Sequence, residues 1–219
     1  MHNSVQKYKD IISSIERKIE AQKIYLTPKV IAVSKTFKLE KILPLIEYGH
    51  LDYGENKVQE AIEKWSEIKL KRQNIKLHLI GRLQTNKVKY AIKIFDFIHS
   101  VDSKKLAKKI ADEQDKQNKK PKLFIQVNIG DEEQKSGVNI DQIEDLILFS
   151  QQLNLNVIGL MCIPPANEEP DKYFKEIKLL NKKFNLSEIS MGMSSDYLKA
   201  VENSSTYLRI GSSIFGQRS

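Results

Sequence analysis

Residues 30–53 have the sequence VIAVSKTFKLEKILPLIEYGHLDY. A short run rich in β-branched residues, Val30–Ser34, is followed by Leu39–Tyr48, where apolar side chains recur every three or four residues, and then by a second short run, His50–Tyr53. Short apolar, β-branched runs are typical of buried strands, and a period of three to four residues is typical of amphipathic helices. The stretch therefore predicts one strand–helix–strand unit of a parallel sheet.

The same alternation continues along the chain. Six further runs have the composition of strands: Leu77–Ile80, Phe97–Ser100, Leu123–Asn128, Val157–Leu160, Glu188–Ser190 and Thr206–Arg209. Most of the longer segments between the strands have helical periodicity, and residues 5–22 predict one more helix before the first strand. Eight strand–helix units in 219 residues predict an α/β fold of the closed (β/α)8 TIM-barrel type. We expect a single barrel domain over residues 1–219 with an extra N-terminal helix.

Composition limits the kind of protein this can be. Hydrophobic residues make up 40% of the chain and charged residues 29%, which is typical of a globular protein. No apolar run approaches the roughly 18 residues that cross a bilayer, and the start lacks the apolar stretch of a secretory signal. The single cysteine, Cys162, can form no internal disulfide and offers no pair of metal ligands. We expect a cytoplasmic protein that binds neither a membrane nor a metal ion.

The net charge of +8 raises the question of nucleic-acid binding. Lysines are nevertheless interspersed with acidic residues, as in the segment EAIEKWSEIK at 60–69. Such mixed charge is typical of a solvated surface. Net charge alone indicates solubility and nonspecific binding, not a specific binding site. We therefore expect no dedicated nucleic-acid surface, and we expect a monomer.

Polar and glycine-rich residues gather directly after the predicted strands, where barrel enzymes keep their sites. The segments after the last two strands, SMGMSS at 190–195 and GSS at 211–213, have the composition of a phosphate-binding site. Glycines let backbone N–H groups approach an anion, serine hydroxyls add donors, and barrels commonly bind phosphate at these two loops. The pattern predicts a bound phosphate ester, and ordinary tight turns are the alternative.

Lys35 and Arg209 are the charged residues that need an explanation. Lys35 follows an apolar strand, where a buried ammonium is costly, and a desolvated amine has the lowered pKa that attack on an aldehyde requires. The alternative is a lysine at the rim with its charge in water. Arg209 lies on the last strand, two residues before Gly211, and can point into the barrel mouth or form a structural ion pair. His78 and His99 lie within strand patterns and are expected to be core histidines.

Eight ordered motifs resemble those of the pyridoxal phosphate homeostasis proteins, a family similar in turn to the N-terminal barrel of alanine racemase. They are AVSKT (32–36), YGENKVQE (53–60), HLIGRLQTNK (78–87), HSVD (99–102), QVN (126–128) with KSG (135–137), GLM (159–161), SMGMS (190–194) and RIGSSIFG (209–216). The resemblance runs from about Val30 to Arg218. Departures are modest: Ser212 stands where the family usually has threonine, so the hydroxyl is kept, and Ser195 stands where aspartate is usual, next to Asp196.

The resemblance implies a cofactor and the residues that bind it. Pyridoxal 5'-phosphate (PLP) would form a covalent aldimine with Lys35, and Arg209 would lie near the ring nitrogen. Arginine stays protonated and cannot accept a proton, so that nitrogen would remain unprotonated and the cofactor would be a weak electron sink. The remaining cofactor-binding residues would be Asn56 beside the ring, Ser190, Gly211 and Ser212 around the phosphate, and Met193 from the same motif as Ser190.

The function implied by the resemblance is intracellular homeostasis of the vitamin B6 cofactor, as a carrier or regulator without substantial catalysis. Apo-enzymes that receive PLP would be its partners. The alternative is a weak amino-acid racemase or another PLP-dependent enzyme. Alanine racemase adds a C-terminal β domain and a tyrosine from the partner subunit as second acid/base, whereas this sequence ends shortly after the barrel. We therefore expect no catalytic residues, and Lys135 is the second candidate for the covalent link.

Overall fold

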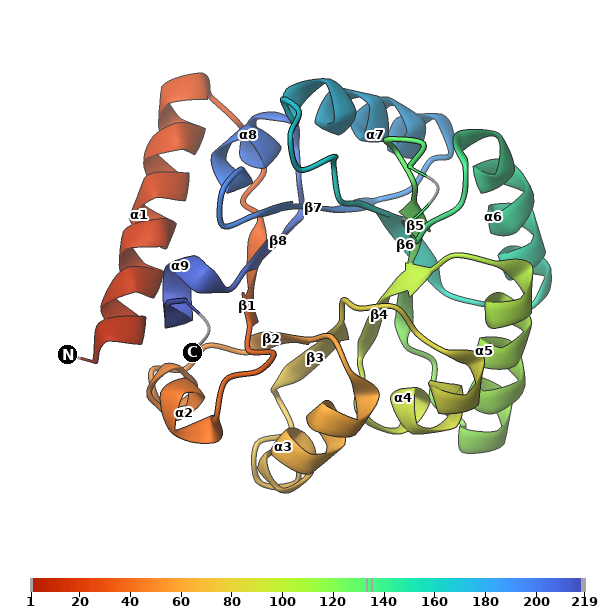
Figure 1. Ribbon diagram of the computed structural model, residues 1–219, viewed down its shortest axis with the longest axis horizontal. Coiled ribbons are helices and arrows are strands. Elements are labelled where there is room, and N and C mark those ends of the chain that lie inside the picture. The colour runs from red at the N-terminus through yellow and green to blue at the C-terminus, as the bar shows by residue number, and fades with distance from the viewer. Residues whose placement is uncertain (1, 133, 135, 218–219) are drawn as a thin grey trace.

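The computed structural model describes residues 2–132, 134 and 136–217. Its centre is a closed barrel of parallel strands in chain order (Figure 1). The strands are β1 (Lys29–Val33), β2 (Asp52–Glu55), β3 (Lys76–Leu79), β4 (Phe97–Val101), β5 (Lys122–Val127), β6 (Val157–Cys162), β7 (Glu188–Met193) and β8 (Tyr207–Ile210). The last strand closes on the first, with Val30 opposite Leu208. The predicted (β/α)8 barrel is confirmed.

Helices surround the barrel on the outside (Figure 1). They are α2 (Leu39–Glu47), α3 (Val58–Lys71), α4 (Val88–Ile94), α5 (Lys104–Gln117), α6 (Ile143–Gln152), α7 (Asp171–Lys183), α8 (Tyr197–Glu202) and α9 (Ser212–Phe215), with short 3-10 helices at Thr85–Lys87 and Ile140–Gln142. The predicted extra helix is α1 (Asn3–Gln22). It packs through Val5, Ile11 and Ile15 and lies against α2, α8 and α9.

The described residues form two apolar cores, one on each side of the strands. The larger lies between strands and helices and includes Trp65 and Phe174. The smaller fills the inside of the barrel with Ile31, Val33, Phe97, Phe124, Met161 and Tyr207. Parallel strands covered on both faces are apolar along most of their length. Seven buried polar residues within the strands depart from this pattern: Glu55, His78, His99, Ser100, Gln126, Ser190 and Arg209.

Three strands end at least two residues later than their sequence predicts. The second is Asp52–Glu55 rather than His50–Tyr53, the sixth continues to Cys162 instead of ending at Leu160, and the seventh continues to Met193 instead of ending at Ser190. The pairing of β7 with β8 changes register between Ser190 and Met193. Gly192 makes this possible with a φ of +89°, and a Cβ there would lie 2.5 Å from that of Ala200. Ser190 is therefore inside the barrel, and the loop to α8 begins only after Met193.

None of the helices in the described part of the chain combines the length and the apolar character that a membrane span requires. The same residues contain no group of three or more histidine, cysteine, aspartate or glutamate side chains placed to hold a metal ion.

Candidate functional site

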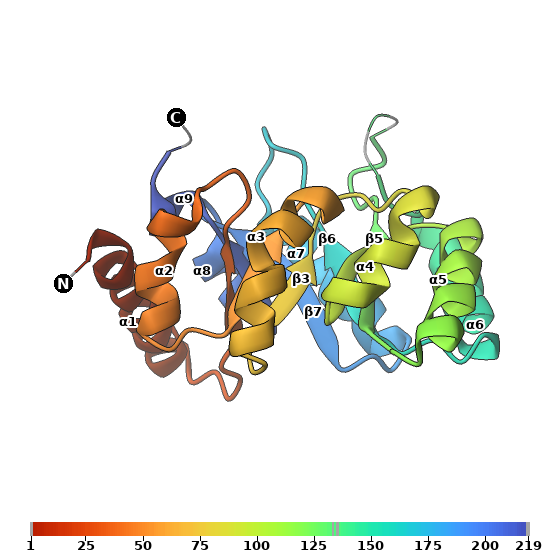
Figure 2. The same cartoon turned by 90° about the horizontal axis from the view of Figure 1, so that it is seen from below.

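A cavity of about 330 Å³ opens at the carboxyl ends of the strands. Seen from the side, the loop that follows β6 projects from this end of the barrel (Figure 2). The loops after β1, β2, β7 and β8 supply most of the cavity wall, and small-molecule sites begin at about 300 Å³. The lining residues are Val33, Lys35, Phe37, Asn56, Ile80, Ile163, Met193, Ser194, Ser195, Arg209, Gly211, Ser212 and Gly216.

Six of the seven binding residues expected from the sequence line this cavity: Lys35, Asn56, Met193, Arg209, Gly211 and Ser212. Ser190 is the exception. It is fully buried within β7, and its hydroxyl is hydrogen-bonded to His99 and Arg209. The prediction placed it in the loop after the seventh strand, whereas the strand continues past it. The structure therefore brings Arg209, rather than the Ser190 hydroxyl, to the cavity.

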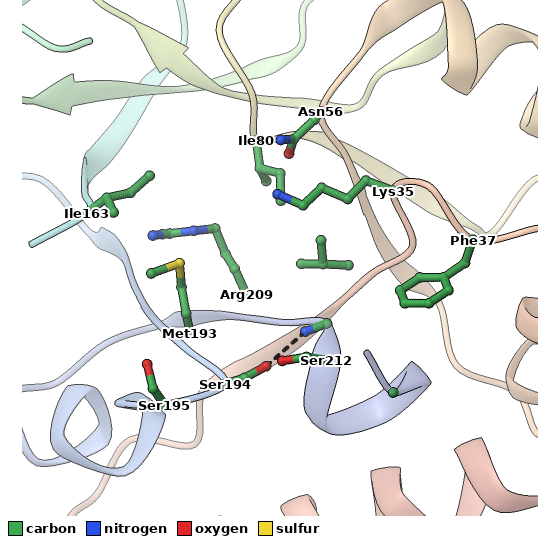
Figure 3. A pocket seen from close by; sticks show the side chains of 13 residues that line it. Lys35, Phe37, Asn56, Ile80, Ile163, Met193, Ser194, Ser195, Arg209 and Ser212 are labelled. Atoms are coloured by element: carbon green, nitrogen blue, oxygen red, sulfur yellow. Dashed lines mark hydrogen bonds between the residues drawn. The ribbon is translucent and has the colours of Figure 1, made fainter. Parts of the chain in front are cut away.

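Ser194 lies in the predicted phosphate-binding segment 190–195 but was not among the binding residues named from the sequence, and it lines the cavity. Its Oγ accepts hydrogen bonds at 3.3 Å from the backbone N–H groups of Gly211 and Ser213. This contact ties the loop after β7 to the loop after β8, and one of the two bonds is the dashed line from Ser194 in Figure 3. Ser194 belongs to the same motif as Ser190 and lies four residues further along the chain.

The backbone on both sides of Lys35 is held by helix α3. Lys64 donates to the carbonyl oxygen of Ser34 at 2.9 Å, and the N–H of Thr36 donates to Glu60 at 2.6 Å. Lys64 and Glu60 also form an ion pair with each other at 2.9 Å. Thr36 has a φ of +66°, a conformation that non-glycine residues adopt at some cost. The contacts with α3 keep this turn in place, and so they fix the point from which Lys35 extends.

Glu55 lies beneath the same turn and is fully buried. Its Oε1 accepts from Ser34 Oγ at 2.7 Å, from Trp65 Nε1 at 2.9 Å and from Lys64 at 3.0 Å. Burial raises the pKa of Glu55, and these donors offset only part of that effect. The carboxyl group joins β1, β2 and α3 under the Lys35 turn.

Arg209 is only 4% exposed and is held by two hydrogen bonds. One nitrogen donates to Ser190 Oγ and another to the carbonyl oxygen of Cys162, both at 2.8 Å. Burial lowers the pKa of Arg209, yet a guanidinium stays protonated in proteins, so the group only donates. The thiol of Cys162 also stays protonated, because burial raises its pKa to about 12.

The side chains of the cavity form a donor set with three parts. Lys35 extends into the pocket on the side of Asn56, Arg209 enters from β8, and Ser194 and Ser212 lie at the end near α9 (Figure 3). An amine can react with an aldehyde, a guanidinium can donate to a fixed acceptor, and hydroxyls beside glycine suit a phosphate. The arrangement suits a small phosphate ester that carries a carbonyl group. Lys135, the second candidate lysine, lies outside the described residues.

Three buried histidines lie below the cavity, and burial lowers the pKa of each: His50, His78 and His99. The nearby Asp52 and Asp96 carboxylates act against this shift at His78, whereas Lys29 adds to it. His99 faces His78 and Arg209, which lower its pKa further. The histidines are therefore neutral in the folded protein near neutral pH.

We expect the free energy of unfolding of the ligand-free protein to fall as the pH decreases from about 6.5. In that range the unfolded chain takes up protons on these histidines and the folded chain does not, so acid favours unfolding. Each histidine contributes up to about 1.4 kcal/mol per pH unit until its own folded pKa is reached. Burial raises the pKa of Glu55 and Asp102, so these carboxyls act in the opposite sense. Urea unfolding between about pH 7.5 and about pH 5.5 measures the slope, and a flat profile would contradict this account.

Comparisons with known proteins agree with the geometry. Residues 12–219 match the family model described as alanine racemase, N-terminal domain. The pyridoxal phosphate homeostasis protein of Aquifex aeolicus is 40% identical over 200 residues, 87% of each chain, and that of Synechocystis is 36% identical over 87% of this chain and 91% of its own.

Solved structures show the same likeness. PipY of Synechococcus elongatus, solved with PLP bound, is 32% identical and has a TM-score of 0.81, with 92% of this chain and 100% of PipY covered. Alanine racemase of Clostridium difficile is 15% identical with a TM-score of 0.70, over 95% of this chain and 57% of the racemase. That second likeness concerns the fold alone.

Proposed function

Because the chain belongs to the pyridoxal phosphate homeostasis protein family, we propose that it binds PLP and takes part in the homeostasis of this cofactor as a carrier. The relatives that carry this name, and PipY with PLP bound, support the proposal. The main structural support for the proposal is the three-part donor set of the cavity, because each part fits one group of PLP.

Each part of the donor set suits a different group of PLP. The Lys35 amine suits the aldehyde, and we propose a covalent link there. The Arg209 guanidinium suits the ring nitrogen, which is a hydrogen-bond acceptor. The hydroxyls of Ser194 and Ser212, beside Gly211, suit the phosphate, while Asn56 and Met193 would border the ring. Ser190 would support Arg209 instead of touching the phosphate.

We also propose that the protein performs no substantial catalysis. PLP, when bound, supplies an electron sink whose strength depends on protonation of the ring nitrogen. Arg209 donates a hydrogen bond but keeps its proton, so it favours the unprotonated ring. Among the described residues that line the cavity, Lys35 and Arg209 are the only ones with titratable side chains. A second acid/base group is thus missing from this wall, which favours a carrier that delivers PLP to apo-enzymes over a racemase.

The binding test uses apo-protein titrated with PLP and with pyridoxal, which lacks the phosphate. We expect saturable binding of PLP, accompanied by an absorbance change, and weaker binding of pyridoxal. PLP should then pass from the loaded protein to an apo-enzyme that requires it, followed as recovered activity of that enzyme. Absence of saturable PLP binding by the wild-type protein would refute the proposal.

Ser212→Ala is expected to weaken PLP binding by about tenfold, because it removes a hydroxyl donor to a charged phosphate. Its affinity for pyridoxal should not change. The matched control is Ser213→Ala, since Ser213 is the next residue of α9 and its side chain does not line the cavity. Equal PLP affinity of the Ser212→Ala variant and the wild type would place the phosphate elsewhere.

A further inference from the structure

A continuous chain of polar side chains runs through the inside of the barrel. Asp52 Oδ1 lies 3.0 Å from His78 Nε2, and His78 Nδ1 lies 3.0 Å from His99 Nε2. His99 Nδ1 lies 2.9 Å from Ser190 Oγ, which accepts from Arg209 at 2.8 Å. Asp52 begins β2 at the floor of the barrel, whereas Arg209 lies near the end of β8 at its mouth. The chain therefore connects the floor to the cavity.

The two histidines of this chain have aromatic surroundings that are closed to solvent. The His78 ring stacks on Phe97 with centroids 4.2 Å apart, and the His99 ring stacks on Phe124 at 4.3 Å. Tyr207 packs against both histidines. Both imidazoles are fully buried. Their ring nitrogens thus depend on the chain for hydrogen bonds, and a buried polar atom left without one costs about 1–3 kcal/mol.

The two ends of the chain fix the direction of every hydrogen bond in it. A guanidinium can only donate, and a carboxylate can only accept. Ser190 therefore accepts from Arg209 and donates to Nδ1 of His99. Nε2–H of His99 donates to Nδ1 of His78, and Nε2–H of His78 donates to Asp52. The opposite assignment would leave a lone pair of neutral His78 facing the carboxylate.

The protonation states agree with this direction. Burial lowers the pKa of both histidines, so each is neutral near neutral pH and has one donor and one acceptor nitrogen. Although partial burial acts against it, the hydrogen bond from His78 and the nearby charge of Lys29 lower the pKa of Asp52, which stays ionised. Lys29 and Asp96 are the other charged groups near His78, and Asp196 is a charged group near Arg209.

We propose that Asp52, His78, His99 and Ser190 are positioning residues whose one-way hydrogen-bond relay fixes the Arg209 guanidinium at the cofactor cavity. Arg209 is held by Ser190 on one nitrogen and by the carbonyl oxygen of Cys162 on another, so the relay is one of its two anchors. The relay thereby determines how well Arg209 can hold the ring-nitrogen edge of PLP. The part of this inference that concerns PLP rests on the proposed function. The direction of the hydrogen bonds in the relay does not depend on it.

The direction is tested first in the ligand-free protein by nitrogen-15 NMR of the imidazole rings. We expect both His78 and His99 to be neutral with the proton on Nε2 between about pH 6.5 and about pH 8. A proton on Nδ1 of either ring, or an imidazolium in this range, would overturn the relay. Because no PLP is present, this result is independent of the proposed function.

The effect on the cofactor is tested with His99→Phe, which keeps an aromatic ring against Phe124 and removes both nitrogens. His50→Phe is the matched control, since His50 is also buried but bonds to the backbone oxygen of Asp52 outside the relay. The two ligands are PLP and an analogue with a C–H in place of the ring nitrogen. We expect His99→Phe to lower the preference for PLP over the analogue by about tenfold and His50→Phe to leave it unchanged.

An unchanged preference in a folded His99→Phe protein that binds PLP would overturn the positioning role. Failure of the wild type to bind PLP would instead overturn the proposed function, so the two failures are distinguishable. Asp52 provides a second pair of variants if His99→Phe does not fold. Asp52→Asn keeps an acceptor oxygen and should keep both the Nε2–H form of His78 and the preference for PLP. Asp52→Leu should lose both, and equal behaviour of the two variants would overturn the proposal.

Discussion

The Lys35→Ala variant is expected to retain no PLP that borohydride can fix, whereas the wild-type protein is labelled at this residue. Lys35 is the lysine that lines the cavity, and its turn is held in place by Glu60 and Lys64. Removing the amine removes the covalent link, while noncovalent contacts to the phosphate and ring remain. Mass spectrometry after borohydride treatment measures the label, and circular dichroism checks that the barrel is intact.

Lys38→Ala is the matched control, because Lys38 lies three residues away in the same connection between β1 and α2, is exposed and does not line the cavity. It should be labelled like the wild type. Label that persists in the Lys35→Ala protein would contradict the assignment. Peptide mapping would then show whether Lys135, the second candidate in the sequence, carries it.

The order of the strands and their parallel arrangement were predictable because both follow from local patterns of apolar residues. Each strand is a short apolar run, and helical periodicity separates most of them, so the eight-stranded barrel follows from counting units. The ends of β2 and β7 were not predictable, because they depend on pairing with neighbouring strands. The register change between Ser190 and Met193 is the clearest case, since it moves Ser190 from the predicted loop into the barrel.

The positions of candidate site residues that directly follow a strand were predictable for the same reason. Lys35 and Asn56 lie at the cavity because the carboxyl ends of the strands meet there. The relay could not be predicted, because its contacts join residues from five strands and depend on which side chains point inward. His78 and His99 were expected to be core histidines, and they are buried, but their mutual hydrogen bond requires the closed barrel.

The contacts that support the Lys35 turn also could not be predicted from the sequence. Lys64 lies in a segment of mixed charge that predicts only a solvated helix face. In the structure its side chain is 9% exposed and bonds to Ser34, Glu55 and Glu60. A charged residue becomes buried there because the turn offers a carbonyl oxygen and Glu55 and Glu60 offer carboxylates within its reach, and a buried charge is tolerated when it is paired in this way.

The PLP-loaded wild-type protein is expected to show no amino-acid racemase or transaminase turnover at or above about 1 s⁻¹, the lower end for ordinary enzymes. Two features lead to this expectation. Arg209 keeps its proton and so favours an unprotonated ring nitrogen, which weakens the electron sink on which removal of an α-proton depends. The described cavity wall also lacks a titratable group besides Lys35 and Arg209. A missing acid/base partner typically costs about 10²–10⁴-fold in rate.

The informative variant is Arg209→Glu. A carboxylate would favour the protonated ring and should raise the rate at which an amino acid exchanges its α-proton with solvent. It would also lose the bonds to Ser190 and to the carbonyl oxygen of Cys162, so PLP should bind more weakly and the assay must be run at saturating PLP. Chiral analysis measures racemase turnover and deuterium exchange measures loss of the α-proton, each for the wild type and the Arg209→Glu variant with the common L-amino acids. Wild-type turnover at or above about 1 s⁻¹ would overturn the carrier proposal and favour the racemase alternative.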